Sequence, residues 1–133
     1  MTESDVLFDT WAWWEYLFQT STGAALRQRF VEGDRFRLHT SAVSLGEIGA
    51  RLIEDEAGKR VEAICGSIRR MSRVWDVTAD IAQEAGPARA RLRKVERSAS
   101  LADAIVFVTA RKAGARIVSA DPAFRGLPDV ISR

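Results

Sequence analysis

The 133-residue sequence has few of the residues on which several common classes of protein depend. It contains one cysteine, Cys65, and one histidine, His39. A single cysteine cannot form an internal disulfide, and one cysteine with one histidine cannot supply the four ligands of a structural zinc site. No apolar run approaches the roughly 20 residues of a membrane-spanning helix, and the acidic start at Glu3 and Asp5 is unlike a signal peptide. We therefore expect a protein of the reducing cytoplasm with no membrane span.

The charge is nearly balanced, with 20 basic and 18 acidic residues, a formal net charge of +2 and a pI of about 9.1. Arginine supplies most of the basic residues, and its planar guanidinium suits phosphate, which favours a nucleic-acid partner. Ordinary surface charge with ion pairs to the acidic residues explains the same composition and is the preferred explanation on charge alone. The contents of 47% hydrophobic and 29% charged residues are typical of a globular chain, and the length suits one domain over residues 1–133.

Short apolar runs alternate with helical patterns along the whole chain. We expect strands at residues 6–8, 35–40, 74–77 and 116–119, and a last edge strand at 129–132. We expect helices from residue 11 onward and at 24–32, 45–57, 61–71, 79–97 and 100–113, with Pro87 kinking or splitting the fifth. Helices between strands, without hairpin signals, predict an α/β fold. Its expected architecture is a three-layer α/β/α sandwich around a mostly parallel sheet of four to five strands.

Four carboxylates stand where these predicted elements begin or end. Asp9 and Asp121 follow predicted strands, whereas Glu47 and Asp103 lie in the first turn of predicted helices. Each position alone is typical of helix capping; Ser44 and Glu47, for example, match a capping box. Capping does not require four carboxylates in one place, however. The carboxyl ends of parallel strands and the helix starts share one rim of the sheet, so we expect the four to converge.

A cluster of four carboxylates predicts a bound cation. Like charges repel strongly in a low-dielectric cleft unless a cation neutralises them. Carboxylate oxygens favour Mg²⁺ or Mn²⁺ over zinc or copper. Such an ion activates water and neutralises charge on a leaving oxygen, which is the chemistry needed to hydrolyse phosphate esters. The sequence therefore predicts Mg²⁺ or Mn²⁺ as the cofactor and a phosphate-bearing substrate.

Four sequence blocks around these acids resemble the signature blocks of the PIN-domain family. The blocks are Phe8-Asp9-Thr10, Ser44-Leu-Gly-Glu47-Ile, Leu101-Ala-Asp103-Ala and Ile117-Val-Ser119-Ala-Asp121-Pro-Ala-Phe124. Their order and spacing match the family over nearly the whole chain. Within the family, the chain is most similar to the short VapC-type toxins of toxin–antitoxin pairs. The resemblance implies a metal-dependent ribonuclease with a compact α/β/α fold.

The resemblance also implies roles for individual residues. The implied catalytic and metal-binding quartet is Asp9, Glu47, Asp103 and Asp121. Asp9 and Asp103 would hold one ion most directly, and Glu47 would complete or bridge its shell. Asp121 would bind a second ion or orient the attacking water. Thr10 and Ser119 match the hydroxyl positions beside the first and last acids, where they would orient ligands or water.

The expected partners follow from the resemblance and from apolar surface. RNA would be the substrate. The face from Val61 to Met71 and the aromatic first helix offer more hydrophobic surface than a small monomer easily hides, which suits a homodimer and a groove for a cognate antitoxin. Trp11, Trp13 and Trp14 could stack on bases, but three tryptophans in a first helix are more typical of a core or an interface.

Other protein classes also begin with a strand followed by an aspartate. A phosphoryl-transfer enzyme with an aspartyl nucleophile usually needs a second aspartate two residues on, where this chain has Trp11. A receiver domain needs an arrangement of acceptor and lysine for which the sequence gives no convincing candidate. Two alternatives stay open: a catalytically silent PIN-like module that binds RNA or acts as a scaffold, and a housekeeping PIN nuclease without an antitoxin. The presence of all four acids counts against the silent module.

Overall fold

The computed structural model describes residues 4–127 and 130–131. Its strands and α-helices, in chain order, are β1 (Asp5–Phe8), α1 (Thr10–Leu17), α2 (Ser21–Leu26), β2 (Arg37–Ser41), α3 (Ala42–Glu54), α4 (Val61–Met71), β3 (Arg73–Trp75), α5 (Ala79–Leu92), α6 (Leu101–Ala113), β4 (Arg116–Val118) and β5 (Val130–Ile131). A π-helical turn at Arg27–Val31 follows α2, and short 3-10 turns lie at Glu32–Asp34, Gly58–Arg60 and Pro122–Phe124.

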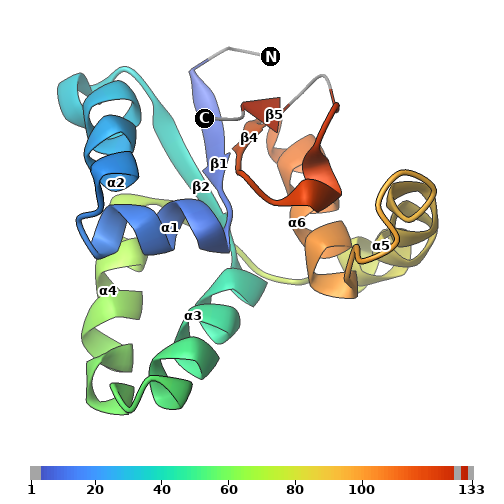
Figure 1. Cartoon of the computed structure of the whole chain (residues 1–133). Coiled ribbons are helices and arrows are strands. Elements are labelled where there is room, and N and C mark those ends of the chain that lie inside the picture. The colour runs from blue at the N-terminus through green and yellow to red at the C-terminus, as the bar shows by residue number, and fades with distance from the viewer. Residues whose placement is uncertain (1–3, 128–129, 132–133) are drawn as a thin grey trace.

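The five strands form one sheet in the order β3-β2-β1-β4-β5. Every neighbouring pair in this sheet is parallel. The first strand in the sequence therefore lies at the centre, and the carboxyl ends of all the strands face the same edge (Figure 1). The predicted α/β fold is confirmed, with a sheet that is parallel throughout the described strands.

The central strand β1 is buried on both faces, as a parallel strand covered by helices should be. Val6 and Phe8 point to one side, where they join a core with Leu52 and Ile68 from the helices. Leu7 points to the other side and packs in a separate core with residues of α6 and β4. The run Val6-Leu-Phe8 is apolar without alternation because each face of the sheet carries its own helical layer.

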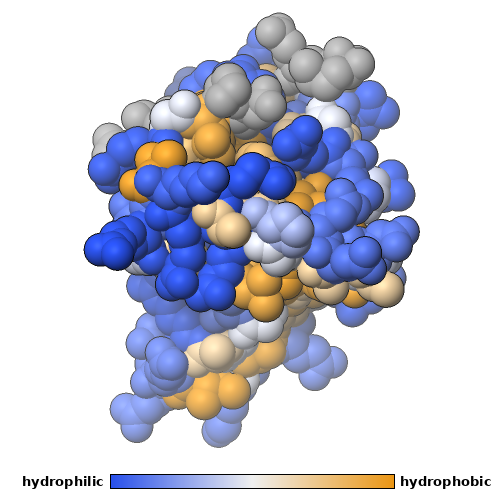
Figure 2. Space-filling view, turned by 90° about the vertical axis from the view of Figure 1, so that its right-hand side faces the viewer, coloured by the Kyte–Doolittle hydropathy of each residue, from blue (hydrophilic) through white to orange (hydrophobic). Residues whose placement is uncertain are grey.

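The two faces of the sheet are covered by helices in different ways. Helices α1 to α4 contribute to the core on the Val6 side. On the Leu7 side, α6 covers the sheet and α5 packs mainly on α6 rather than on the strands (Figure 1). The face that carries α5 shows predominantly hydrophilic side chains with scattered apolar ones (Figure 2). The arrangement is the predicted three-layer sandwich, with α5 as an outer support for α6.

Of the three tryptophans in α1, Trp13 is the fully buried one. Its ring contacts Phe8 edge-on, and its Nε1 donates a hydrogen bond of 3.0 Å to Thr40 Oγ1 in β2. Trp11 and Trp14 are only partly buried against the same core. Trp13 is therefore a core residue, whereas Trp14 keeps an accessible face.

Two helices begin three residues earlier than the sequence pattern predicts. Helix α2 begins at Ser21 rather than Ala24, because Thr20 accepts a hydrogen bond of 2.9 Å from the Gly23 amide and caps it. Helix α3 begins at Ala42 rather than Leu45, with Ser41 as its N-cap. In both cases the capping residue lies in a polar segment that is also typical of a loop between two elements. The apolar periodicity begins only after that segment, so periodicity alone places the helix start too late.

Helix α5 ends at Leu92, five residues before the predicted end at Arg97, and it is not split at Pro87. Thr78 caps its start as the sequence indicates, accepting a hydrogen bond from Ile81 N. Proline removes the hydrogen bond to the carbonyl four residues earlier. That carbonyl belongs to Gln83, an exposed residue, so water can replace the missing donor.

The last predicted strand, residues 129–132, is observed as the two-residue β5. Residues 129 and 132 lie outside the described part of the chain. Within the described residues, no helix combines the length and apolar character needed to cross a membrane.

Candidate functional site

Asp9 follows β1 directly and is the most deeply buried of the four candidate acids, with 5% of its surface exposed. One carboxylate oxygen accepts a hydrogen bond of 2.9 Å from the Ala12 amide, which makes Asp9 the N-cap of α1. The other oxygen accepts a hydrogen bond from the Ser119 hydroxyl. The carboxylate is thus fixed by its own helix on one side and by the end of β4 on the other.

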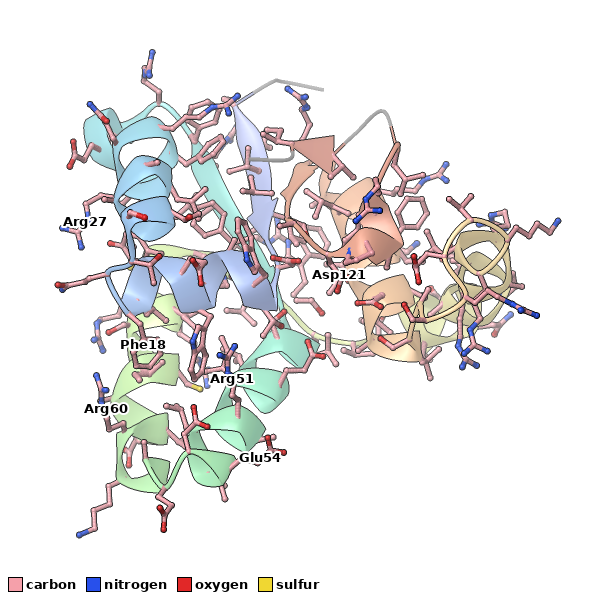
Figure 3. All side chains as sticks on the ribbon, in the orientation of Figure 1. Phe18, Arg27, Arg51, Glu54, Arg60 and Asp121 are labelled. Carbon is pink, nitrogen blue, oxygen red and sulfur yellow. The ribbon has the colours of Figure 1, made fainter. Side chains whose placement is uncertain are left out.

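Ser119 links the first and the last of the four acids. The residue follows β4 and is 1% exposed. Its hydroxyl donates to Asp9 and accepts a hydrogen bond of 2.8 Å from the Asp121 amide. Asp121 in turn accepts a hydrogen bond of 2.9 Å from the Ala123 amide and caps the 3-10 turn that begins at Pro122. In Figure 3, Asp121 lies between α1 and α6.

Asp103 lies in the first turn of α6, where it forms the capping box that its spacing from Ser100 indicates. Its amide donates to Ser100 Oγ at 3.0 Å, and its carboxylate accepts from the Ser100 amide at 2.8 Å. At the other end of α6, Gly114 adopts a left-handed conformation with φ of 64°, as the predicted stop requires. Both ends of α6 are therefore set by local sequence.

Glu47 lies in the same region, but its position in the helix differs from the predicted one. Because α3 begins at Ala42, Glu47 is in the second turn of the helix and not in the first. The predicted capping box between Ser44 and Glu47 is wrong: Ser44 is buried inside the helix, and its hydroxyl has no hydrogen-bond partner among the residues that the structure describes. Glu47 Oε1 instead accepts a hydrogen bond of 2.6 Å from Thr10 Oγ1 at the start of α1.

Asp103 and Asp121 act electrostatically on both Asp9 and Glu47. Burial raises the pKa of Asp9 from its ordinary value of 3.8 to about 7, against the opposing effect of the hydrogen bonds from Ser119 and Ala12. Burial also raises the pKa of Glu47, and the negative charges of Asp103 and Asp121 add to the rise at both sites. The pKa of Asp121 is raised by burial and by neighbouring Asp103. The structure therefore gathers the four residues that the sequence singled out.

A fifth carboxylate, Glu96, lies near this cluster and was not anticipated from the sequence. Its negative charge contributes to the raised pKa of Asp121. Glu96 belongs to none of the four sequence blocks, and it follows the end of α5, which lies earlier than predicted. No signal in the sequence pointed to it, because its position depends on how the segment between α5 and α6 folds back.

The donor set suits a hard divalent cation, since it consists of carboxylate oxygens. Among residues 4–127 and 130–131, no three acidic, histidine or cysteine side chains are close enough to hold an ion in their present conformations. The carboxylates of Glu47 and Asp103 are each turned toward a hydrogen-bond donor, the Thr10 hydroxyl and the Ser100 amide. The residues thus fit Mg²⁺ or Mn²⁺ in their chemistry, and ion binding would require these two carboxylates to exchange their present hydrogen bonds.

The capping interpretation and the metal interpretation are compatible. Asp9, Asp103 and Asp121 all accept hydrogen bonds from backbone amides at helix starts. Glu47 caps no helix, so capping does not account for its position. Burial and neighbouring charge raise the pKa values of Asp9, Glu47 and Asp121, which is a cost that capping alone would avoid.

Sequence comparison places the chain in a family. The model of the PIN domain matches residues 6–130, a range that includes all four acids. The chain belongs to the PIN-domain family. No curated protein sequence matches this PIN domain.

Several solved structures share the fold of this PIN domain. A chain of VapBC2 from Rickettsia felis, crystallised with a DNA fragment from its promoter, aligns with a TM-score of 0.72 and 12% identity over 97% of both chains. VapC20 from Mycobacterium tuberculosis, described as a toxin that cleaves the sarcin-ricin loop, aligns with a TM-score of 0.68 and 25% identity over 94% of this chain and 98% of its own. A VapBC chain from Salmonella typhimurium has a TM-score of 0.70, 17% identity and coverages of 97% and 96%. The fold is therefore that of VapBC toxin–antitoxin proteins.

Proposed function

We propose that this PIN domain is a metal-dependent endoribonuclease and the toxin of a type II toxin–antitoxin pair. The observation that carries the proposal is the gathering of Asp9, Glu47, Asp103 and Asp121 from four different parts of the chain, where burial and the charges of Asp103 and Asp121 raise the pKa values of Asp9 and Glu47. The neighbours of known structure support the biological setting, since VapC20 is described as a toxin that cleaves the sarcin-ricin loop and others are toxin–antitoxin complexes.

In the proposed mechanism, the four carboxylates would hold Mg²⁺ or Mn²⁺. When bound, a divalent cation activates water and neutralises charge on the reacting phosphate. Asp9 is the fixed ligand, because the Ala12 amide and the Ser119 hydroxyl hold its two oxygens. Glu47 and Asp103 are the adjustable ligands, since each can exchange one hydrogen bond for the ion.

Asp121 is the residue we assign to the attacking water or to a second ion. It is less buried than Asp9, so its carboxylate reaches solvent at the rim. In the metal-free protein, burial and the charge of Asp103 raise the pKa of Asp121, and a neighbouring cation would favour the ionised carboxylate that accepts a proton from water. The Ser119 hydroxyl holds the Asp121 amide and thereby sets the position of this acid relative to Asp9.

The proposed partners are an RNA substrate, a cognate antitoxin and a second copy of the chain. The antitoxin is supported by the neighbours, which include toxin–antitoxin complexes. For the homodimer, the supporting feature is the partly buried apolar side chains of α1 and α4. The proposal treats residues 1–133 as one domain acting in the cytoplasm.

The test is cleavage of RNA by the purified protein with Mg²⁺, with Mn²⁺ or with EDTA. We expect products that depend on the metal and that disappear in Asp103→Asn and Asp121→Asn variants. Glu54→Gln is the matched control, because Glu54 is an exposed acid on α3 outside the cluster. A protein that binds RNA but yields no metal-dependent products would be the silent module instead.

A second experiment separates a toxin from a housekeeping nuclease. We expect a small open reading frame beside the gene, whose product binds this chain and suppresses the cleavage. A chain that cleaves RNA but has no such neighbour and no effect on growth when expressed would be a housekeeping nuclease.

A further inference from the structure

Helices α1 and α3 lie side by side and meet through two pairs of residues one helical turn apart. The first pair is Thr10 and Glu47, joined by the hydrogen bond of 2.6 Å. The second pair lies four residues further along each helix, where the guanidinium of Arg51 sits 3.8 Å from the centre of the Trp14 ring. Residues four apart share a helix face, so the second pair continues the line of the first, outward from the acidic cluster.

Arg51 has the features of a cation that is held in place but still available. The residue is exposed, and among the described residues its guanidinium forms no ion pair with a carboxylate. A guanidinium lying over an aromatic ring keeps its N–H donors in its own plane, at the edges, where they can meet a phosphate. The Trp14 ring restricts the conformations of the side chain, so less entropy is lost when a ligand binds.

We propose that Arg51, held in position by Trp14, binds a phosphate of the RNA strand next to the phosphate that is cleaved. The inference rests on the proposed ribonuclease function and extends the same site by one phosphate. A strand that places one phosphate at the acids must overcome their negative charge. Arg51 lies four residues after Glu47, about 6 Å along the axis of α3, so its guanidinium offsets that repulsion and gives the strand a defined direction.

Arg60 provides a matched comparison on the same surface. Its guanidinium lies over the Phe18 ring at 5.2 Å, so it is also an exposed arginine on an aromatic ring of the α1 segment. Arg60 belongs to the 3-10 turn Gly58–Arg60 that follows α3, beyond the end of the helix that carries Glu47 and Arg51. In Figure 3, Arg51 lies on the Asp121 side of the pair formed by Phe18 and Arg60. The proposal assigns the phosphate to Arg51 alone.

The test is RNA binding measured by fluorescence anisotropy in the Asp9→Asn background, where cleavage cannot consume the probe. The probe is a fluorescein-labelled single-stranded RNA of about 20 nucleotides, titrated in Mg²⁺ at salt concentrations from about 50 to 200 mM. We expect Arg51→Gln to raise Kd about tenfold, the value of one charge-assisted hydrogen-bond contact. The slope of log Kd against log salt should fall by about 0.7, the value for one phosphate contact on a single strand.

Two companion variants make the result specific. Arg51→Lys keeps the charge but loses the planar guanidinium, so it should retain the salt slope while weakening binding. Arg60→Gln removes an equivalent surface charge and should leave Kd and slope unchanged. Melting curves of all variants verify that they fold.

Several outcomes would overturn the proposal. Unchanged binding in Arg51→Gln would do so, as would an equal loss in Arg60→Gln, which would indicate a diffuse charge effect. Loss of antitoxin binding with intact RNA binding would assign Arg51 to a protein interface instead, and no RNA binding by the Asp9→Asn protein would remove the site altogether. A parent protein that binds RNA without cleaving it would count against the ribonuclease and leave the anisotropy result to decide on Arg51.

Discussion

The Ser119 hydroxyl is a single group on which two acids depend. It donates to the Asp9 carboxylate and accepts from the Asp121 amide, in a position that is almost completely buried. A buried carboxylate that loses a donor is left with an unsatisfied oxygen. The position therefore needs a hydroxyl, and a methyl group cannot replace it.

We predict that Ser119→Ala weakens Mg²⁺ binding by about 10- to 100-fold, the range found when a group that orients a ligand is removed. The hydrogen bond from Ser119 lowers the pKa of Asp9, so its loss also raises that pKa further and leaves less ionised ligand near pH 7. Calorimetric titration with Mg²⁺ at pH 7 measures the affinity. Ser119→Thr keeps the hydroxyl and serves as the control; equal affinities in the alanine and threonine variants would contradict the prediction.

Asp9 also makes the stability of the metal-free protein depend on pH. Its pKa is about 7 in the folded protein against an ordinary value of 3.8, so the folded state binds an additional proton between these two values. The stability that comes from the protonated form is complete below about pH 4 and is lost as the pH rises to about 7. We predict a loss on the order of 4 kcal/mol over this range, since one pKa unit corresponds to about 1.36 kcal/mol.

Denaturant unfolding in EDTA at several pH values measures this loss. Asp9→Asn can still cap α1 but carries no charge, so its stability should fall much less between pH 4 and 7. A parent and variant with parallel pH profiles would show that Asp9 is ionised throughout. The raised pKa values of Glu47 and Asp121 act in the same direction and account for the dependence that remains in the variant.

At the scale of elements, the corner between α1 and α2 depends on a residue without a side chain. A Cβ added at Gly23 would lie 1.9 Å from the Glu15 carbonyl oxygen, which is backbone and cannot turn away. Thr20 caps α2 through the Gly23 amide and also donates to Glu15 Oε1 at 2.9 Å. The two short helices can pack this closely only because position 23 is glycine.

We predict that Gly23→Ala lowers the free energy of unfolding by about 2–3 kcal/mol, the cost of forcing an added atom into a packed contact. Gly46→Ala is the matched comparison, because a Cβ there meets no atom within 4 Å in the middle of α3. The free energy of unfolding of that variant should rise by about 0.5–1 kcal/mol, since alanine favours the helix more than glycine. Urea unfolding of both variants measures the difference, and equal stabilities would show that the corner relaxes freely.

At the scale of the whole molecule, the cluster joins parts of the chain that only the sheet brings together. Asp9 comes from the start of the chain and Asp121 from near its end, and they meet because β1 and β4 are neighbouring strands. A cation held between them should therefore stabilise the entire fold. The predicted stabilisation acts on the whole domain, whereas a helix cap stabilises one helix end.

We predict that Mg²⁺ raises the free energy of unfolding by about 2.7 kcal/mol when its concentration is a hundred times Kd. The melting temperature should rise by several degrees, and the rise should be larger at pH 8 than at pH 6, because metal binding requires ionised carboxylates. Differential scanning fluorimetry with Mg²⁺ and with EDTA measures it. The double variant Asp103→Asn, Asp121→Asn should show no rise, and a parent that melts identically in both solutions would contradict metal binding.

The sequence by itself determined the fold class and the order of the strands and helices, and it singled out the four acids of the candidate site. It could do so because each signal is local: an apolar strand followed by Asp9, a capping box at Ser100, and a strand followed by Asp121 and proline. The carboxyl ends of parallel strands share an edge, so a strand pattern alone brings Asp9 and Asp121 to one place.

Only the tertiary structure decided how these residues are used. Each of these uses depends on segments that are distant in the sequence. Examples are the burial of Asp9, the hydrogen bond from Thr10 to Glu47, the proximity of Glu96 to Asp121 and the position of Arg51 over the Trp14 ring. The start of α3 shows the reason. The polar junction before it permits either of two caps, and the choice of Ser41 over Ser44 turns Glu47 from the helix start to its side, facing α1. A difference of three residues in one helix boundary thus sets which partner an acid meets, and only packing against neighbouring elements fixes that boundary.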